Sequence, residues 1–215
     1  MISSADQDGY EALQRGSEYY DLAMSFTEAS DHAERIACFQ EAERCYLQAA
    51  EKGNLVAWMC LGYVYSYDRC EGKYEPLPGQ APGEPYPRER RAFECYRVAA
   101  EAGFAEACYK LGDMLQKGVG CNPDAVEAFR WYKQSSELSD GTPPAVWGSA
   151  ALRLADAYEN GLGCRQSFEQ ALEWYRRAVV GLEIAVRDGD WFYERVLVRA
   201  RNGEKRTRQE LDPMS

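Results

Sequence analysis

Apolar and small residues recur along this chain at the spacing of an amphipathic helix. One pattern has an alanine, a leucine four residues later, a small residue directly after it, and an aromatic or leucine side chain three positions further on. It occurs as AWMCLGYVY (57–65), ACYKLGDML (107–115) and AALRLADAY (150–158), with a fainter first copy in YDLAMSF (20–26). Residues at this spacing lie on one face of an α-helix. The pattern therefore predicts a series of similar helices, called A helices below.

A second pattern alternates with the first. It occurs as AERCYLQAAEKG (42–53), AFECYRVAAEAG (92–103), AFRWYKQSSE (128–137) and ALEWYRRAVV (171–180). Each copy has a tyrosine at the same position: Tyr46, Tyr96, Tyr132 and Tyr175. The alanines and aromatic residues again share one helix face, which predicts a B helix after each A helix. The shortest interval between these tyrosines is 36 residues, so the chain consists of repeats, some of which carry insertions.

Two glycines one residue apart separate the A and B patterns in two repeats. They are Gly118 and Gly120 in one copy, and Gly161 and Gly163 in the next. A Gly-x-Gly motif can begin a phosphate-binding loop, but here no strand precedes it, and neither a third glycine nor a Gly-Lys-Ser/Thr sequence follows. Asn122 suits a helix N-cap, Pro123 the first turn, and Asp124 the positive end of the helix. The motif therefore predicts a turn between two helices.

The combined pattern Ala-x3-Leu-Gly-x2-Tyr, Gly-x-Gly and Ala-x2-Trp-Tyr-x2-Ala-Ala-Glu-x-Gly resembles the Sel1-like repeat, a relative of the tetratricopeptide repeat. The resemblance extends over residues 16–181. It implies an all-α fold, an α/α solenoid with a right-handed superhelix, built from about four helix pairs. The units span residues 16–53, 54–103, 104–139 and 146–181, after a lead-in at 1–15.

Three further segments lie outside the regular pattern. Residues 66–90 form a Pro- and Gly-rich insert in the second unit, which predicts a surface loop. Residues 182–202 include DWFYERVLVRA, which predicts a C-terminal capping helix, since a terminal repeat needs cover for its open face. Residues 203–215 are strongly polar and predict a disordered tail.

The net charge of −10 argues against binding to nucleic acid or to an anionic membrane surface, because both require a basic surface. The first residues have neither a basic segment nor an apolar core of the kind that a signal peptide requires. We therefore expect a cytoplasmic protein.

The sequence offers little for catalysis. The chain has eight cysteines without a Cys-x-x-Cys pair and a single histidine, His32, so we expect reduced thiols and no metal or cofactor site. We interpret His32 as a surface or helix-capping residue. Cys121 and Cys164 occupy equivalent positions in adjacent units. Because the motifs of common hydrolases are missing, we expect a protein that is not an enzyme.

The sequence leaves two catalytic alternatives open. Asp113 and Asp156 occupy equivalent positions in adjacent units, and neighbouring carboxylates can divide into an acid and a base. The resemblance also implies a second alternative, a hydrolase of the kind suggested for cysteine-rich Sel1-like relatives.

In tetratricopeptide-like arrays the A helices line the concave side, and the resemblance implies the same arrangement here. Side chains two positions before and after the key leucine then face the groove, followed by Glu159. The predicted groove residues are Tyr20, Met24, Met59, Tyr63, Tyr109, Asp113, Leu152, Asp156 and Glu159. The alternative is that these side chains pack between helices.

The apolar and aromatic members of this row suit contacts with a peptide, and the acidic members suit a partner with a basic end. We therefore expect a non-enzymatic interaction module, or adaptor, that binds a peptide or protein segment in its concave groove. A self-associating structural scaffold is the alternative, and the oligomeric state stays open.

Overall fold

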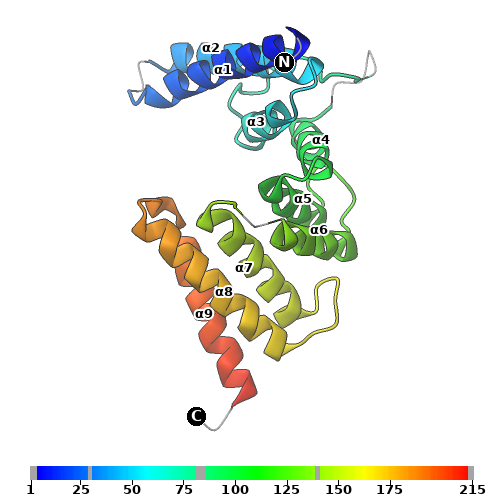
Figure 1. The fold of residues 1–215 in the computed structure, drawn as a ribbon, viewed down its shortest axis with the longest axis vertical. Coiled ribbons are helices and arrows are strands. Elements are labelled where there is room, and N and C mark those ends of the chain that lie inside the picture. Colours follow the sequence, from blue (N-terminus) through cyan, green and yellow to red (C-terminus); the bar gives the residue numbers. More distant parts are fainter. Residues whose placement is uncertain (1–3, 29–30, 81–85, 139–140, 213–215) are drawn as a thin grey trace. The chain divides into compact units, whose positions relative to one another are not determined.

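The computed structural model describes residues 4–28, 31–80, 86–138 and 141–212, and within these ranges every regular element is a helix. The chain divides into two compact units, Met1–Ala102 and Gly103–Ser215. The helices of the first unit run from blue to green in Figure 1, and those of the second unit from green to red.

The first unit consists of two helix pairs. Its helices are α1 (Ser4–Ser25), α2 (His32–Glu51), α3 (Leu55–Ser66) and α4 (Arg88–Glu101). In each pair a glycine of the A helix faces the tyrosine of the B helix. A Cβ atom on Gly62 would lie 2.5 Å from the Tyr96 ring, and one on Gly16 would lie 2.6 Å from the Tyr46 ring. In α3 this glycine is the small residue of the sequence pattern, which is required because a buried ring occupies the space next to it. In α1 the glycine at the ring is Gly16, and not Ala23 of the fainter first copy.

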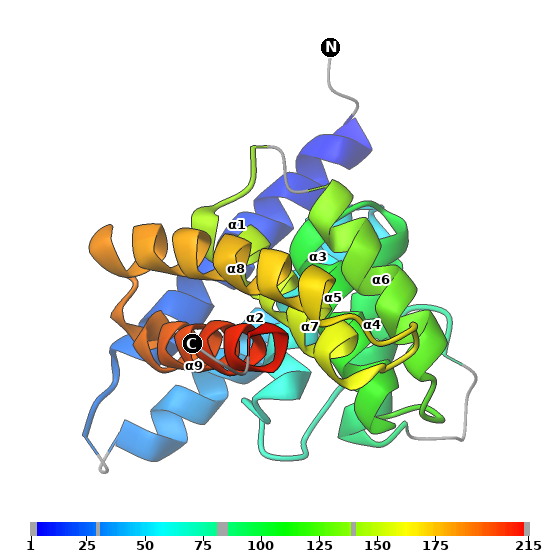
Figure 2. The same cartoon turned by 90° about the horizontal axis from the view of Figure 1, so that it is seen from below.

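The second unit consists of two helix pairs and a final helix. Its elements are α5 (Ala105–Lys117), α6 (Ala125–Glu137), α7 (Pro144–Asn160), α8 (Phe168–Arg187), the short 3-10 helix η2 (Trp191–Tyr193) and α9 (Glu194–Leu211). Helix α9 lies alongside α8 (Figure 2). Leu197 and Ala200 of α9 join a buried cluster with Leu152 and Tyr175.

The Gly-x-Gly segments are turns, as predicted. Gly118 ends α5 with φ 68°, and Gly161 ends α7 with φ 67°, a left-handed conformation that favours glycine. The start of α6 differs by two residues from the predicted one. Asp124 is the N-cap, because its side chain accepts a hydrogen bond from the backbone N–H of Glu127.

The described part of the 66–90 insert is anchored to its own unit. Cys70 and Leu77 are buried, and the Tyr74 ring packs edge-on against Tyr65 at 5.0 Å. The backbone N–H of Glu75 donates to Glu43 Oε1 at 3.2 Å. Residues 81–85 lie outside the described part of the chain.

The prediction of disorder from residue 203 onward is wrong as far as Leu211, because α9 continues to that residue. Gly203 and Thr207 are buried, and a Cβ atom on Gly203 would lie 2.3 Å from the Tyr175 ring. In the last pair, α7 has Ala155 where α3 and α5 have Gly62 and Gly112. Here α9 therefore supplies a glycine that meets the tyrosine ring. Residues 213–215 of the predicted tail lie outside the described residues.

In the ranges that the structure describes, no helix combines the length and the low charge that a membrane span requires.

Candidate functional site

The predicted groove residues do not share one environment. Met59, Tyr109 and Leu152, all two positions before a key leucine, are buried, with Tyr109 3% and Leu152 1% exposed. The expectation that these three side chains face an open groove is therefore wrong. Leu152, for example, packs in the cluster formed with α8 and α9. For these positions packing between helices, the alternative interpretation, is correct.

Asp113 and Tyr109 of α5 are bound to an arginine of α7. Arg153 donates two hydrogen bonds to Asp113, from Nε at 2.7 Å and from Nη2 at 2.5 Å. Its guanidinium also lies 4.5 Å from the centre of the Tyr109 ring. Asp113 accepts a further hydrogen bond from the Tyr132 hydroxyl at 3.0 Å. These contacts hold α5, α6 and α7 together and satisfy the carboxylate within its own unit.

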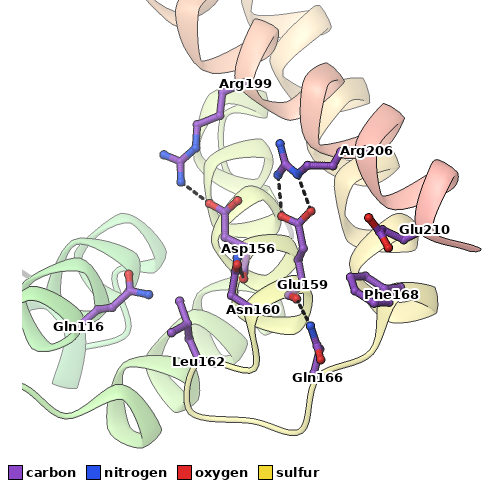
Figure 3. Close-up of a pocket in the computed structure, with 10 residues that line it drawn as sticks. All are labelled: Gln116, Asp156, Glu159, Asn160, Leu162, Gln166, Phe168, Arg199, Arg206 and Glu210. Atoms are coloured by element: carbon purple, nitrogen blue, oxygen red, sulfur yellow. Dashed lines mark hydrogen bonds and ion pairs between the residues drawn. The ribbon is translucent and has the colours of Figure 1, made fainter.

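Asp156 and Glu159 of α7 lie at a cavity of about 630 Å³ beside α9 (Figure 3). Arg206 donates to both oxygens of Glu159, from Nε at 2.7 Å and from Nη2 at 2.6 Å. Arg199 forms an ion pair with Asp156. The Tyr175 hydroxyl contacts both carboxylates, at 2.7 Å each. The acidic groups that were predicted to receive a basic partner are thus already paired with arginines of α9.

The pKa values of Asp156 and Glu159 shift in opposite directions. Burial raises the pKa of Asp156, and this effect outweighs the hydrogen bond from Tyr175 and the charge of Arg199. Burial also acts to raise the pKa of Glu159, but the hydrogen bonds from Arg206 and Tyr175 outweigh it, and the pKa is lowered. Glu159 is therefore the more strongly stabilised anion of the pair.

The rest of this cavity is mostly polar. Its other lining residues are Gln116, Asn160, Leu162, Gln166, Phe168 and Glu210. The Gln166 side-chain amide donates to the backbone carbonyl of Glu159 at 2.8 Å (Figure 3). Amides and paired charges of this kind can bind a polar group, but they present no nucleophile activated by a base.

Three of the four predicted groove residues of the first unit, all except Met59, keep an accessible surface. Tyr20 and Tyr63 are partly exposed, and Met24 is 51% exposed. Tyr63 stacks on Tyr67, with ring centres 6.1 Å apart, and Tyr67 is 54% exposed. We call the four residues Tyr20, Met24, Tyr63 and Tyr67 the aromatic surface.

Sequence reasoning missed two residues in this region, Tyr67 and Arg69. The guanidinium of Arg69 lies within 6 Å of the ring centres of Tyr20, Phe39 and Tyr67. Both residues fall just after the repeated A pattern, in the insert, where periodicity carries no information. The feature of the sequence that could have indicated Arg69 is its position two residues after Tyr67, the last of three alternating tyrosines.

His32 begins α2 and takes no part in a catalytic pair. Its Nε2 lies 3.1 Å from Glu71 Oε1, and its Nδ1 lies 3.1 Å from Arg35. All three side chains are at the surface. Because Glu71 belongs to the 66–90 insert, its contact with His32 connects α2 to the insert.

None of the eight cysteines, all of which lie in the described ranges, forms a disulfide. Burial raises the pKa of Cys95 well above its ordinary value, which makes this thiol unreactive. The thiols of Cys121 and Cys164 donate to backbone carbonyls seven residues earlier, Met114 and Ala157. Within the described residues, no three His, Cys, Asp or Glu side chains converge as they would to hold a metal ion.

A family model described as the Sel1 repeat matches residues 39–54, 79–104, 105–140 and 148–179, about half of the chain. Among solved structures, a Sel1 repeat protein from Oxalobacter formigenes matches with a TM-score of 0.51 and 23% identity. The match covers 82% of this chain and 69% of that protein. It supports the fold, and the predicted all-α solenoid of helix pairs is confirmed.

Two further similarities are more distant or more partial. A protective antigen of uropathogenic Escherichia coli strains, which displays an SLR fold, matches with a TM-score of 0.42 and 18% identity, covering 98% of this chain and 48% of that one. Chitin synthase regulatory factor 1 of Schizosaccharomyces pombe is 39% identical over 88 residues, or 41% of this chain. The aligned region is 17% of that protein, so the similarity concerns a small part of its length.

Proposed function

Because the chain belongs to the Sel1 repeat family, we propose that it is a non-enzymatic interaction module that binds a segment of another protein. Sel1 repeat proteins generally serve as protein-interaction modules. The name of the fission yeast relative describes a regulatory factor, which agrees with an action through binding.

The aromatic surface of the first unit is the observation that carries this proposal. Tyr67 and Met24 are each more than half exposed, and Tyr20 and Tyr63 lie partly open. Tyrosine and methionine side chains offer large contact areas at a low entropic cost, and exposed groups of them commonly mark binding surfaces.

The structure gives no support to the expectation that the partner has a basic end. A basic end was expected because Asp113, Asp156 and Glu159 were taken to be open. Each now has an arginine partner within the second unit, so these residues give no support to a basic ligand.

No observation favours the hydrolase alternative. Asp113 and Asp156 each accept hydrogen bonds from an arginine and a tyrosine, which is the arrangement of a structural ion pair. For a self-associating scaffold, the supporting feature is Trp191, which is 74% exposed. Light scattering after size exclusion tests that alternative. A cytoplasmic location stays a prediction.

The experiment uses a phage library of random twelve-residue peptides and the full chain immobilised on a surface. We expect enrichment of peptides with aromatic or aliphatic side chains. The double variant Met24→Ala, Tyr67→Ala removes two exposed side chains of the aromatic surface, and we expect it to lose the enrichment with an unchanged melting temperature.

The control is Val126→Ala, which truncates an equally exposed apolar side chain on α6. This variant should retain the enrichment. The proposal is wrong if the wild-type chain enriches no peptides, or if the double variant enriches the same peptides as the wild type.

A further inference from the structure

Arg69 contains the one buried side-chain nitrogen or oxygen atom that has no hydrogen-bond partner among the described residues. The atom is Nε, and the guanidinium forms no ion pair within the described ranges. Leaving a charged donor buried and unpaired costs free energy, so such atoms are rare in folded proteins. The Arg69 side chain is otherwise partly exposed, so its Nη groups, unlike Nε, can reach an acceptor on another molecule.

The backbone holds Arg69 in a defined position. The N–H of Asp68 donates to the Tyr65 carbonyl, and the N–H of Arg69 donates to the Val64 carbonyl, which together form the Schellman motif that ends α3. Asp68 has φ 50°, an unusual value for a residue other than glycine. Its carboxylate accepts hydrogen bonds from the Gly72 N–H and the Tyr74 hydroxyl, which stabilise this turn.

Aromatic rings from α1, from α2 and from the residue that follows α3 lie around the guanidinium. The ring centres of Tyr67, Phe39 and Tyr20 lie 5.1, 5.2 and 5.8 Å from Arg69 Cζ. The rings keep the side chain in place and exclude water from part of it, but they cannot accept the in-plane N–H bonds. Two of the rings, those of Tyr20 and Tyr67, belong to the aromatic surface.

We propose that Arg69 binds the carboxylate of an aspartate or glutamate side chain, carried by an apolar segment of a partner protein. The proposal rests on the function proposed above and specifies the chemistry of its ligand. A carboxylate matches the planar fork of a guanidinium and forms charge-assisted hydrogen bonds with it. The rings of the aromatic surface would contact the apolar residues on either side of the acidic one.

A single carboxylate suits this site better than a polyanion. Helix α1 also carries Glu18 and Asp21, which flank Tyr20 in sequence, and the whole chain has a net charge of −10. These negative charges would repel a nucleic acid or an anionic membrane, which carries many charges over a large area. A single acidic side chain in an apolar segment experiences much less of this repulsion.

The test uses the same phage library with the full chain in four forms: wild type, Arg69→Met, Arg69→Lys and the control Arg15→Met. Arg15 is exposed and lies nine residues before Met24 on α1, which puts it on the opposite side of the helix. We expect wild type and Arg15→Met to enrich peptides with one acidic residue between apolar ones. Arg69→Met should lose the acidic preference.

The enriched peptide is then synthesised with its acidic residue as Glu and as Gln, with both termini blocked. We expect wild type to bind the Gln form about ten- to a hundredfold more weakly. Arg69→Met should bind both forms equally, and Arg69→Lys should bind the Glu form with intermediate affinity. If the blocked peptide loses all affinity, the ligand is a chain terminus and the proposal is wrong.

The melting temperature separates recognition from folding. Because Arg69→Met removes an unpaired buried donor, we expect its melting temperature to be unchanged or higher, which a purely structural arginine would not allow. Enrichment of peptides without acidic residues overturns this inference but leaves the interaction module intact. If no peptide is enriched at all, the proposed function fails as well.

Discussion

Arg206 of α9 forms two hydrogen bonds with Glu159 of α7, 47 positions earlier in the chain. Glu159 also contacts the hydroxyls of Tyr175 and Thr207, so that helices α7, α8 and α9 meet at one carboxylate. This carboxylate and the buried contacts of Gly203 explain why the polar C-terminal segment is helical.

Glu159→Ala should destabilise the second unit by about 2–4 kcal/mol, because it leaves several donors without their acceptor. Arg206→Gln should cost about 1 kcal/mol or less, since the Arg206 side chain is 55% exposed. Urea denaturation followed by circular dichroism measures both. Equal effects of the two substitutions would contradict the role assigned to the buried carboxylate.

The substitution Gly203→Ala tests whether α9 packs against α8. It should lower the stability if α9 is packed and raise it if α9 is exposed to solvent. In a solvent-exposed helix, alanine in place of glycine stabilises by about 1 kcal/mol. Here the new Cβ atom would lie 2.3 Å from the Tyr175 ring, so we expect a loss of about 1–3 kcal/mol.

Asn202→Ala, at the exposed neighbouring position, is the matched control for thermal melting. It should have little effect. A higher melting temperature for Gly203→Ala would show that this part of α9 does not pack against α8.

The buried carboxyl group of Glu43 predicts that the stability of the first unit depends on pH. Burial raises its pKa from 4.5 to about 7, against the opposing hydrogen bonds from Tyr65 and Glu75. The folded chain therefore keeps a proton on Glu43 that the unfolded chain has lost between pH 4.5 and about 7. The contribution of Glu43 to the free energy of unfolding thus falls as the pH rises through this window.

Glu43→Gln keeps an acceptor for Tyr65 and Glu75 but cannot ionise. We expect this variant to lose less stability than wild type between pH 5 and pH 8, as measured by urea denaturation at both pH values. Glu51→Gln, an exposed substitution on the same helix, should behave like wild type. Parallel pH profiles for wild type and Glu43→Gln would refute this assignment.

Tyr175→Phe tests whether a hydroxyl couples α8 to α7. The substitution keeps the buried ring but removes the hydroxyl that contacts Asp156 and Glu159. We expect a loss of about 1–3 kcal/mol, because both acceptors are carboxylates. A free energy of unfolding equal to that of wild type would mean that the arginines alone satisfy the two carboxylates.

Helix pairs and the turns between them follow from the sequence alone, as do some of the contacts inside a pair. The glycine at 62 and the tyrosine at 96, for instance, occupy fixed places in a repeated pattern, and they meet in the structure. Such features depend on helical periodicity and on local backbone conformation, both of which are visible over a few residues.

Packing between helices that are distant in sequence determines which side chains remain available for binding. Tyr109 and Leu152 face the interior, although their positions along the helix equally allowed a groove. Asp156 and Glu159 pair with arginines more than forty residues away, whereas the Arg69 guanidinium lies beside aromatic rings and its Nε has no acceptor in the part of the chain that the structure describes. The rotation of one helix against the next decides such contacts, and no short-range pattern in the sequence specifies that rotation.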